Sequence, residues 1–292
     1  MKHRGLISSL VATAATAATA ATAVLLAGCG DAGSASARAN SSGVSSDVSV
    51  DSAGRAGAPG RPTIVIEHGA FADASGWDGV AGRLRRAGYP VIAPANPLRG
   101  VGSDADYLKS VLATIPTPVV LVGHSYGGMV ITNAAVGAPN VKALVYVAAI
   151  ATDEGESQMD IFTRFPGSLL GPSTTLERPF PGGVDQYIDP RAFRDVFAAD
   201  QPPAKAAEMA ATQRPLAMVA SQEKSGPPAW RALPSWYMVA KEDHAIPPAA
   251  ERFMAERAHA HTVEVKSSHA VMMSHPAAVT KLILDAVRGR SS

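Results

Sequence analysis

The sequence has little of the residue types that mark several classes of protein. Its 292 residues include one cysteine, Cys29, which excludes an intramolecular disulfide and a cysteine-rich zinc site. Charged residues make up 17% of the chain, the formal net charge is +1, and no basic block of the kind that neutralises phosphates occurs. This balance argues against nucleic acid as a partner. Hydrophobic residues reach 47%, so the chain can bury a sizeable core.

The first 28 residues have the composition of a targeting segment. Lys2 and Arg4 form a positive start, and a run rich in Ala, Thr, Leu and Val extends over residues 6–27. The run ends in Leu26-Ala27-Gly28-Cys29, which resembles the lipobox of bacterial lipoproteins. That resemblance implies a lipoprotein signal peptide over residues 1–28, export, and lipid attachment at Cys29 that holds the protein at a membrane. An ordinary cleaved signal peptide or an uncleaved membrane helix are the alternatives.

Residues 29–60 are predicted to form a flexible tether. They consist mainly of Gly, Ala and Ser with few large apolar side chains, so they bury too little surface to offset the entropy lost on ordering. A flexible chain of this length spans roughly 30 Å on average. The folded domain is therefore expected to begin near residue 61.

From residue 61 to the end of the chain, short apolar runs alternate with helical stretches. The runs expected to form strands are residues 63–67, 90–93, 119–122, 142–147, 235–240 and 262–265. Continuous apolar runs are typical of a parallel sheet covered on both faces. The helical period is clearest near the C-terminus, at Val279, Leu282, Ile283, Ala286 and Val287. The alternation predicts an α/β domain with a doubly wound, mostly parallel sheet.

The segment from about residue 152 to 228 interrupts this alternation. It is rich in Pro and Gly and carries scattered Phe and Met side chains. A long insertion in a compact α/β unit is usually functional, so we expect an inserted cap that acts as a lid. Its 11 acidic and 7 basic residues give a net charge of −4, which offers no concentrated positive patch for an anionic substrate.

A candidate nucleophile follows the third apolar run. Gly123-His124-Ser125-Tyr126-Gly127 has the pattern G-x-S-x-G between an expected strand and the expected helix 129–136. The tight turn requires a strained backbone at Ser125, and glycines at 123 and 127 remove side chains that would collide there. The Tyr126 amide, at the start of a helix, would point toward the Ser125 hydroxyl.

The base and the acid are expected later in the chain, in the order serine, acid, histidine. Among the downstream histidines, His269 lies in a polar break between the last expected strand and the last helix. Since the carboxyl ends of parallel strands share one sheet edge, this loop would reach Ser125. His259 and His261 precede that strand, and His275 is followed by proline and fits a first helical turn.

The acid follows the preceding strand, where Glu242 and Asp243 are both candidates and Asp153 and Glu154 are the outside alternatives. Its task is to accept the second ring N–H of the histidine. Gly69 and Ala70 follow the first expected strand, and the Ala70 amide would complete an oxyanion hole with that of Tyr126. His68, beside Gly69, is expected to brace this loop.

Several stretches carry a resemblance to a known family: His68-Gly69-Ala70-Phe71, Trp77, residues 88–91, residues 122–128, Lys241-Glu242-Asp243 with residues 245–248, and Ser268-His269-Ala270 with the residues up to Pro276. They resemble the esterase branch of the α/β-hydrolases, and in particular the group of bacterial esterases, plant methylesterases and hydroxynitrile lyases. The resemblance covers residues 62–288. It implies the α/β-hydrolase fold with a helical cap, supports His269 and favours Asp243 as the acid.

The expected activity is that of a serine hydrolase that cleaves neutral, fairly hydrophobic carboxylic esters through an acyl-enzyme on Ser125, with no metal or organic cofactor. A hydroxynitrile-lyase-like enzyme and an inactive lipid-anchored binding protein are the alternatives. In the lyases of this group, as the resemblance implies, threonine replaces the glycine of the His-Gly loop and a lysine lies near the histidine. Here the loop keeps Gly69, and Lys266 is expected to face solvent.

Overall fold

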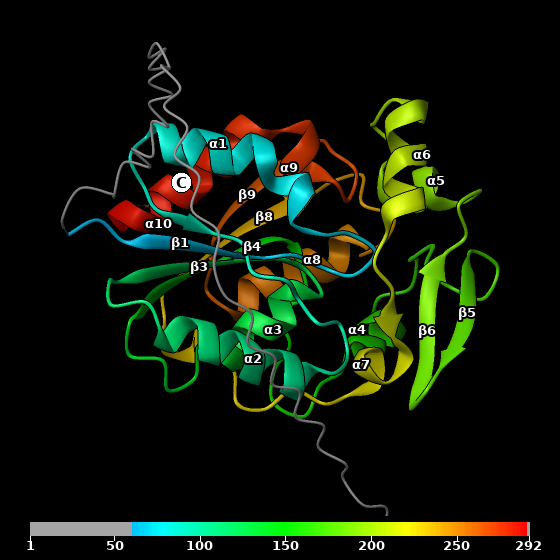
Figure 1. Cartoon of the computed structure of the whole chain (residues 1–292), viewed down its shortest axis with the longest axis horizontal. Coiled ribbons are helices and arrows are strands. Elements are labelled where there is room, and N and C mark those ends of the chain that lie inside the picture. The colour runs from blue at the N-terminus through cyan, green and yellow to red at the C-terminus, as the bar shows by residue number, and fades with distance from the viewer. Residues whose placement is uncertain (1–59, 291–292) are drawn as a thin grey trace, which may run out of the picture. The chain divides into compact units, whose positions relative to one another are not determined.

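The central sheet follows the predicted pattern of strands. The computed structural model describes residues 60–290, in which six strands form one sheet in the order β2-β1-β3-β4-β8-β9 (Figure 1). They are β1 (Thr63–Glu67), β2 (Val91–Ile92), β3 (Val119–Ser125), β4 (Val141–Ala149), β8 (Ser235–Ala240) and β9 (His261–Val265). All neighbouring strands are parallel, which confirms the doubly wound α/β class.

Helices cover both faces of this sheet because successive strand residues point to opposite sides. Ile64 and Ile66 pack with one helical layer, whereas Val65, between them, packs with the other. The first layer holds α1 (Asp78–Arg86), α9 (Val271–Ser274) and α10 (Pro276–Arg288), with the short 3-10 helix η1 (Ala74–Trp77) leading into α1. The second holds α2 (Val101–Ala113), α3 (Gly127–Ala134) and α8 (Pro248–Arg257).

The insertion between β4 and β8 contains more than the helices that were expected. Its helices are α4 (Gln158–Arg164), α5 (Phe193–Phe197), α6 (Pro203–Thr212) and α7 (Met218–Gln222), and the 3-10 helix η2 (Ala229–Arg231) leads back to β8. In addition, β5 (Thr175–Phe180), β6 (Gly183–Ile188) and β7 (Leu216–Ala217) form an antiparallel sheet. The cap predicted as helical therefore has helices and, in addition, a small antiparallel sheet.

The hairpin β5–β6 explains this difference. Pro181-Gly182 joins the two strands, and the φ of Gly182 is +102°, a conformation that glycine adopts at little cost. A Pro-Gly pair that looks like loop composition is here the turn of a hairpin. Figure 1 shows β5, β6, α5 and α6 of this cap (green to yellow) beside the sheet.

The N-terminal part of the chain, residues 1–59, lies outside the described residues. The predicted signal peptide (1–28), Cys29 and all but the last residue of the predicted tether (29–60) lie outside the described residues. None of the helices within residues 60–290 combines the length and apolar character needed to cross a membrane.

Candidate active site

The turn between β3 and α3 holds Ser125 in the strained conformation that the motif predicts. The φ of Ser125 is +52°, in the left-handed region that non-glycine residues rarely adopt. A Cβ on Gly123 would lie 2.7 Å from the Gly127 carbonyl oxygen, and one on Gly127 would lie 2.5 Å from the Glu67 carbonyl oxygen. The turn therefore closes only with glycine at both positions.

His269 and Asp243 form a buried pair at the carboxyl ends of β9 and β8. The His269 Nδ1 atom lies 2.5 Å from Asp243 Oδ2, and both side chains are almost fully buried. The other carboxylate oxygen, Oδ1, accepts hydrogen bonds from the Ala245 and Ile246 amides at 2.7 and 2.8 Å. The carboxylate is thus held by its own loop and can accept a hydrogen bond from the Nδ1–H, which leaves Nε2 of His269 free to act as a base.

The other candidate carboxylates make different contacts. Glu242 is half exposed, with Lys266 at 3.5 Å, and Lys266 itself is 77% exposed, as expected for a side chain facing solvent. Asp153 and Glu154 both pair with Arg231, at 2.6 and 3.8 Å. Of the four carboxylates that the sequence left open, Asp243 is the one that contacts His269.

His124, inside the G-x-S-x-G motif, connects the turn to the histidine loop. Its Nε2 atom lies 3.0 Å from the His269 carbonyl oxygen, and the two rings are 4.6 Å apart. Burial lowers the pKa of His124 well below its ordinary value, and the neighbouring His269 acts in the same direction. A neutral ring donates from Nε2 to that carbonyl. The motif pattern by itself predicts no role for His124.

These contacts bring His269 beside the turn that carries Ser125. Ser125 is 9% exposed, and its hydroxyl makes no hydrogen bond to any side chain or backbone group in residues 60–290. The hydroxyl is therefore available to a bound molecule.

Two backbone amides near Ser125 have the properties of an oxyanion hole. A Cβ on Gly69 would lie 2.5 Å from Ser125 Cβ, so the backbone of the loop after β1 lies directly against Ser125. Ala70 and Tyr126 are both buried, and within residues 60–290 neither amide donates a hydrogen bond. Buried amides without a partner are rare, and two of them beside a serine hydroxyl could hold a developing negative charge.

His68 braces the loop after β1, as expected. Its Nδ1 atom lies 2.9 Å from the Gly69 carbonyl oxygen, and its Nε2 atom accepts the Asn96 amide at 3.0 Å. The Asn96 side chain donates back to the His68 carbonyl oxygen at 2.9 Å. Burial lowers the pKa of His68, so the ring is neutral, and both of its nitrogens are occupied in holding the loop.

The ring of Tyr126 is anchored in a polar network that the sequence did not reveal. Its hydroxyl donates to Asp104 Oδ2 at 2.8 Å, and the Asp104 carboxylate also accepts the Arg99 amide at 3.1 Å. The Arg99 guanidinium then pairs with Asp185 of the cap at 2.7 Å. Asp104 and Arg99 thereby connect Tyr126 to Asp185 of the cap, which lies more than 80 positions after Arg99 in the chain.

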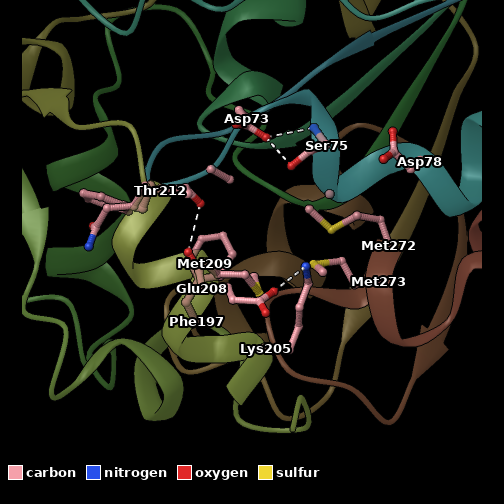
Figure 2. A pocket seen from close by; sticks show the side chains of 14 residues that line it. Asp73, Ser75, Asp78, Phe197, Lys205, Glu208, Met209, Thr212, Met272 and Met273 are labelled. Carbon is pink, nitrogen blue, oxygen red and sulfur yellow. Dashed lines mark hydrogen bonds and ion pairs between the residues drawn. The ribbon is translucent and has the colours of Figure 1, made fainter. Parts of the chain in front are cut away.

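A cavity of about 400 Å³ lies between the cap and the core, beside Phe71 and Phe197 (Figure 2). Its apolar lining includes Phe71, Phe197, Met209, Met272 and Met273, and its polar lining includes Asp73, Ser75, Lys205, Glu208 and Thr212. Neither Ser125 nor His269 is among the lining residues. Phe71 follows Ala70 in the chain, and the Phe197 ring lies edge-on to His269 with centroids 4.8 Å apart. These two rings therefore connect the cavity to the surroundings of His269 and Ala70.

Comparisons with known proteins found relatives that carry esterase names. Polyneuridine aldehyde esterase from Rauvolfia serpentina is 26% identical over 76% of this chain and 94% of its own length. The carbendazim hydrolyzing esterase of Nocardioides sp. is 36% identical, over 35% of this chain and 47% of its own length. A crystal structure of polyneuridine aldehyde esterase matches 77% of this chain and 98% of its own, with a TM-score of 0.67 and 23% identity.

The model of the alpha/beta hydrolase family matches residues 64–282, most of the described chain. The match and the shared architecture confirm the fold that the sequence motifs imply. By sequence and by fold, this chain belongs to the alpha/beta hydrolase family.

Proposed function

We propose that this protein hydrolyses carboxylic esters through an acyl-enzyme on Ser125. The observation that carries the proposal is the buried His269–Asp243 pair beside a strained serine whose hydroxyl has no partner within residues 60–290. A serine hydroxyl is a weak nucleophile unless a neighbouring base takes its proton, and these residues supply that base and its orienting acid. Two relatives that carry esterase names support the same reaction class.

The proposed mechanism uses only groups of this chain and water. The Ser125 hydroxyl attacks the ester carbonyl carbon while His269 Nε2 takes its proton, and the amides of Ala70 and Tyr126 hold the oxyanion. The C–O bond to the alcohol then breaks, and the alcohol leaves with the proton from His269. Water, deprotonated by the same histidine, attacks the acyl carbon, the bond to Ser125 Oγ breaks, and His269 returns its proton to Ser125 as the acid leaves. Asp243 holds the ring and stabilises its charged form.

The lining of the cavity supports a neutral and fairly hydrophobic substrate. Phenylalanine and methionine side chains supply apolar surface, and methionine adapts to irregular shapes. Lys205 pairs with Glu208 at 3.2 Å, and Asp73 adds a negative charge. Since the one lysine of the lining is already neutralised, the cavity favours an uncharged ester over an anionic one.

The residues around Gly69 favour ester hydrolysis over cyanohydrin cleavage. A threonine side chain at position 69, which the lyases carry, would place Cβ 2.5 Å from Ser125 Cβ. Lys266 faces solvent and contacts Glu242, so it offers no fixed positive charge to a departing cyanide. An uncompensated anion in an apolar pocket is costly.

A direct test compares purified wild-type protein and the Ser125→Ala variant on three reagents. We expect wild type to turn over p-nitrophenyl esters and to be labelled by a fluorophosphonate, and Ser125→Ala to do neither. Rapid benzaldehyde release from mandelonitrile without ester turnover would establish the lyase alternative instead. Absence of fluorophosphonate labelling in well-folded wild type would identify an inactive binding protein.

A further inference from the structure

The loop that carries His269 is attached to the cap by one carboxylate. Asp200 follows α5 of the cap, and its Oδ2 atom accepts the Ser267 hydroxyl at 2.9 Å and the Ser268 amide at 3.0 Å. Its Oδ1 atom accepts the Ser268 hydroxyl at 2.6 Å. Three donors from the two residues preceding His269 therefore converge on a single side chain.

The same short stretch of the cap also contacts the other side of His269. The Ala270 amide donates to the Phe197 carbonyl oxygen at 3.1 Å, and the Phe197 ring lies edge-on to the His269 ring. Gln201 donates from its side-chain amide to the Ser274 hydroxyl at 2.6 Å. Residues 197–201 thus hold the backbone before and after the histidine.

The charge state of Asp200 suits this arrangement. Burial acts to raise the pKa of the carboxyl, but hydrogen bonds led by those of Ser268 outweigh it and hold the pKa below its ordinary value. The side chain is ionised at neutral pH and accepts hydrogen bonds on both oxygens. Hydrogen bonds to a charged acceptor are about twice as strong as neutral ones. Asp200 therefore restrains the loop more firmly than a neutral side chain would.

We propose that Asp200 is a positioning residue for His269, so that the cap contributes to reactivity at Ser125 as well as to the choice of substrate. The proposal rests on the proposed ester hydrolysis, in which Nε2 of His269 exchanges a proton with Ser125. Proton transfer is sensitive to small displacements of the base. A cap that acted only as a lid would leave turnover of a very small ester unchanged when this carboxylate is removed.

The experiment compares Asp200→Ala and Asp200→Asn with p-nitrophenyl acetate as substrate. Alanine removes all three acceptor contacts, so we expect kcat to fall by roughly 10- to 100-fold while KM changes by less than about threefold. Asparagine keeps one oxygen for Ser267 and the Ser268 amide, and its NH₂ group can donate to the Ser268 hydroxyl. We expect Asp200→Asn to retain kcat to within about threefold of wild type.

Glu223 provides a matched control in the same cap. Its carboxylate accepts the Val101 amide at 2.7 Å and the Gly102 amide at 3.0 Å, at the start of α2. Glu223→Ala therefore also removes hydrogen bonds between a carboxylate of the cap and backbone amides of the core. These amides belong to α2 and not to the loop that carries His269. We expect a comparable loss of thermal stability and a kcat within about twofold of wild type.

Hydrogen exchange of the full-length protein separates this proposal from the proposed function. Asp200→Ala should speed amide exchange in the peptide covering residues 267–270, and Glu223→Ala should not, whether or not the protein cleaves esters. Ester turnover by wild type with unchanged kcat in Asp200→Ala, or with equal losses in Glu223→Ala, would overturn the positioning role. Faster exchange in Asp200→Ala with no turnover of any ester by wild type would support the loop attachment and reject the esterase.

Discussion

Asp243 and Glu242 are neighbours in the chain, but their carboxylates lie in different surroundings. Asp243 is buried against His269, whereas Glu242 is half exposed beside Lys266. The chain turns directly after β8, and the two side chains have different partners and different burial. The geometry therefore favours Asp243 as the acid of the proposed triad.

Substitution of these two residues tests that assignment. Asp243→Asn should lower kcat by on the order of 10⁴, because an amide in place of the carboxylate favours the wrong tautomer of His269. Glu242→Gln, the matched control, should leave kcat within about twofold of wild type, because its side chain does not reach the ring. The measurement is kcat on a p-nitrophenyl ester. A severe Glu242→Gln phenotype with a mild Asp243→Asn phenotype would show that the acid is misassigned.

Gly69 is a position at which adding a single carbon atom should strongly lower kcat. A Cβ there would lie 2.5 Å from Ser125 Cβ and 2.9 Å from the His124 carbonyl oxygen, so the Ala70 amide must move. Gly69→Ala should lower kcat by roughly 10²- to 10³-fold, as does loss of one oxyanion donor. Gly171→Ala is the control, because a Cβ on Gly171 meets nothing within 4 Å. Full activity in Gly69→Ala would exclude this loop from the oxyanion hole.

At the scale of elements, the cavity lies between α6 of the cap and the residues around η1 and α9 of the core. Figure 2 shows Met209 on the cap side and Met272 and Met273 on the core side. Substrate size should depend on this separation, because the lining side chains from the two parts set the width available to a bound group.

A larger side chain on α6 should discriminate between small and large esters. Met209→Trp fills part of the cavity, so kcat/KM should fall at least about tenfold for a p-nitrophenyl octanoate and by less than about twofold for the acetate. Met159→Trp on α4 is the matched control, since Met159 is 47% exposed and does not line the cavity. Equal losses on both esters in Met209→Trp would mean that the cavity is not the substrate site.

At the scale of the whole molecule, Glu67 places a carboxyl group in the interior of the fold. It is fully buried at the end of β1, and neither carboxyl oxygen has a partner within residues 60–290. Burial raises its pKa well above the ordinary value of 4.5, and the neighbouring Asp104 acts in the same direction. The folded protein therefore keeps this proton to a higher pH than the unfolded chain does.

Stability should consequently decline as pH rises. The protonated Glu67 side chain contributes fully to the free energy of unfolding below the pKa that Glu67 has in the unfolded chain. As the pH rises from there toward the raised pKa of the folded protein, this contribution is lost, by at most about 1.4 kcal/mol per pH unit. Glu67→Gln cannot ionise, so its Tm relative to wild type should increase between about pH 5 and about pH 8. Thermal unfolding of both proteins across this range measures the difference. A constant difference in Tm would show that Glu67 does not titrate on folding.

We also propose, from the sequence, that the protein is exported and anchored to a membrane by lipid on Cys29. Cys29→Ser should release the protein from the detergent-extracted membrane fraction and abolish incorporation of labelled palmitate, because the serine hydroxyl does not replace the acylated thiol. Wild type carrying the label is the reference. Membrane retention of Cys29→Ser without label would indicate an uncleaved helix.

The class of the sheet, the position of the serine turn and the bracing role of His68 could all be predicted from the sequence. These features are local: a strand follows from a run of apolar residues, and the turn follows from glycines at fixed offsets from Ser125. The strained φ of Ser125 and the bracing by His68 agree with the prediction for the same reason.

The tertiary structure decided what depends on residues far apart in the chain. Only the packed structure shows that Asp243, and not Glu242, Asp153 or Glu154, contacts His269. It also shows that Pro181-Gly182 is the turn of a hairpin. Asp200 contacts Ser267 and Ser268, which are distant from it in the chain. No periodicity or spacing encodes such contacts, because they exist only once β8, β9 and the cap are packed together. The partner of a buried polar group is set by that packing and not by its neighbours in sequence.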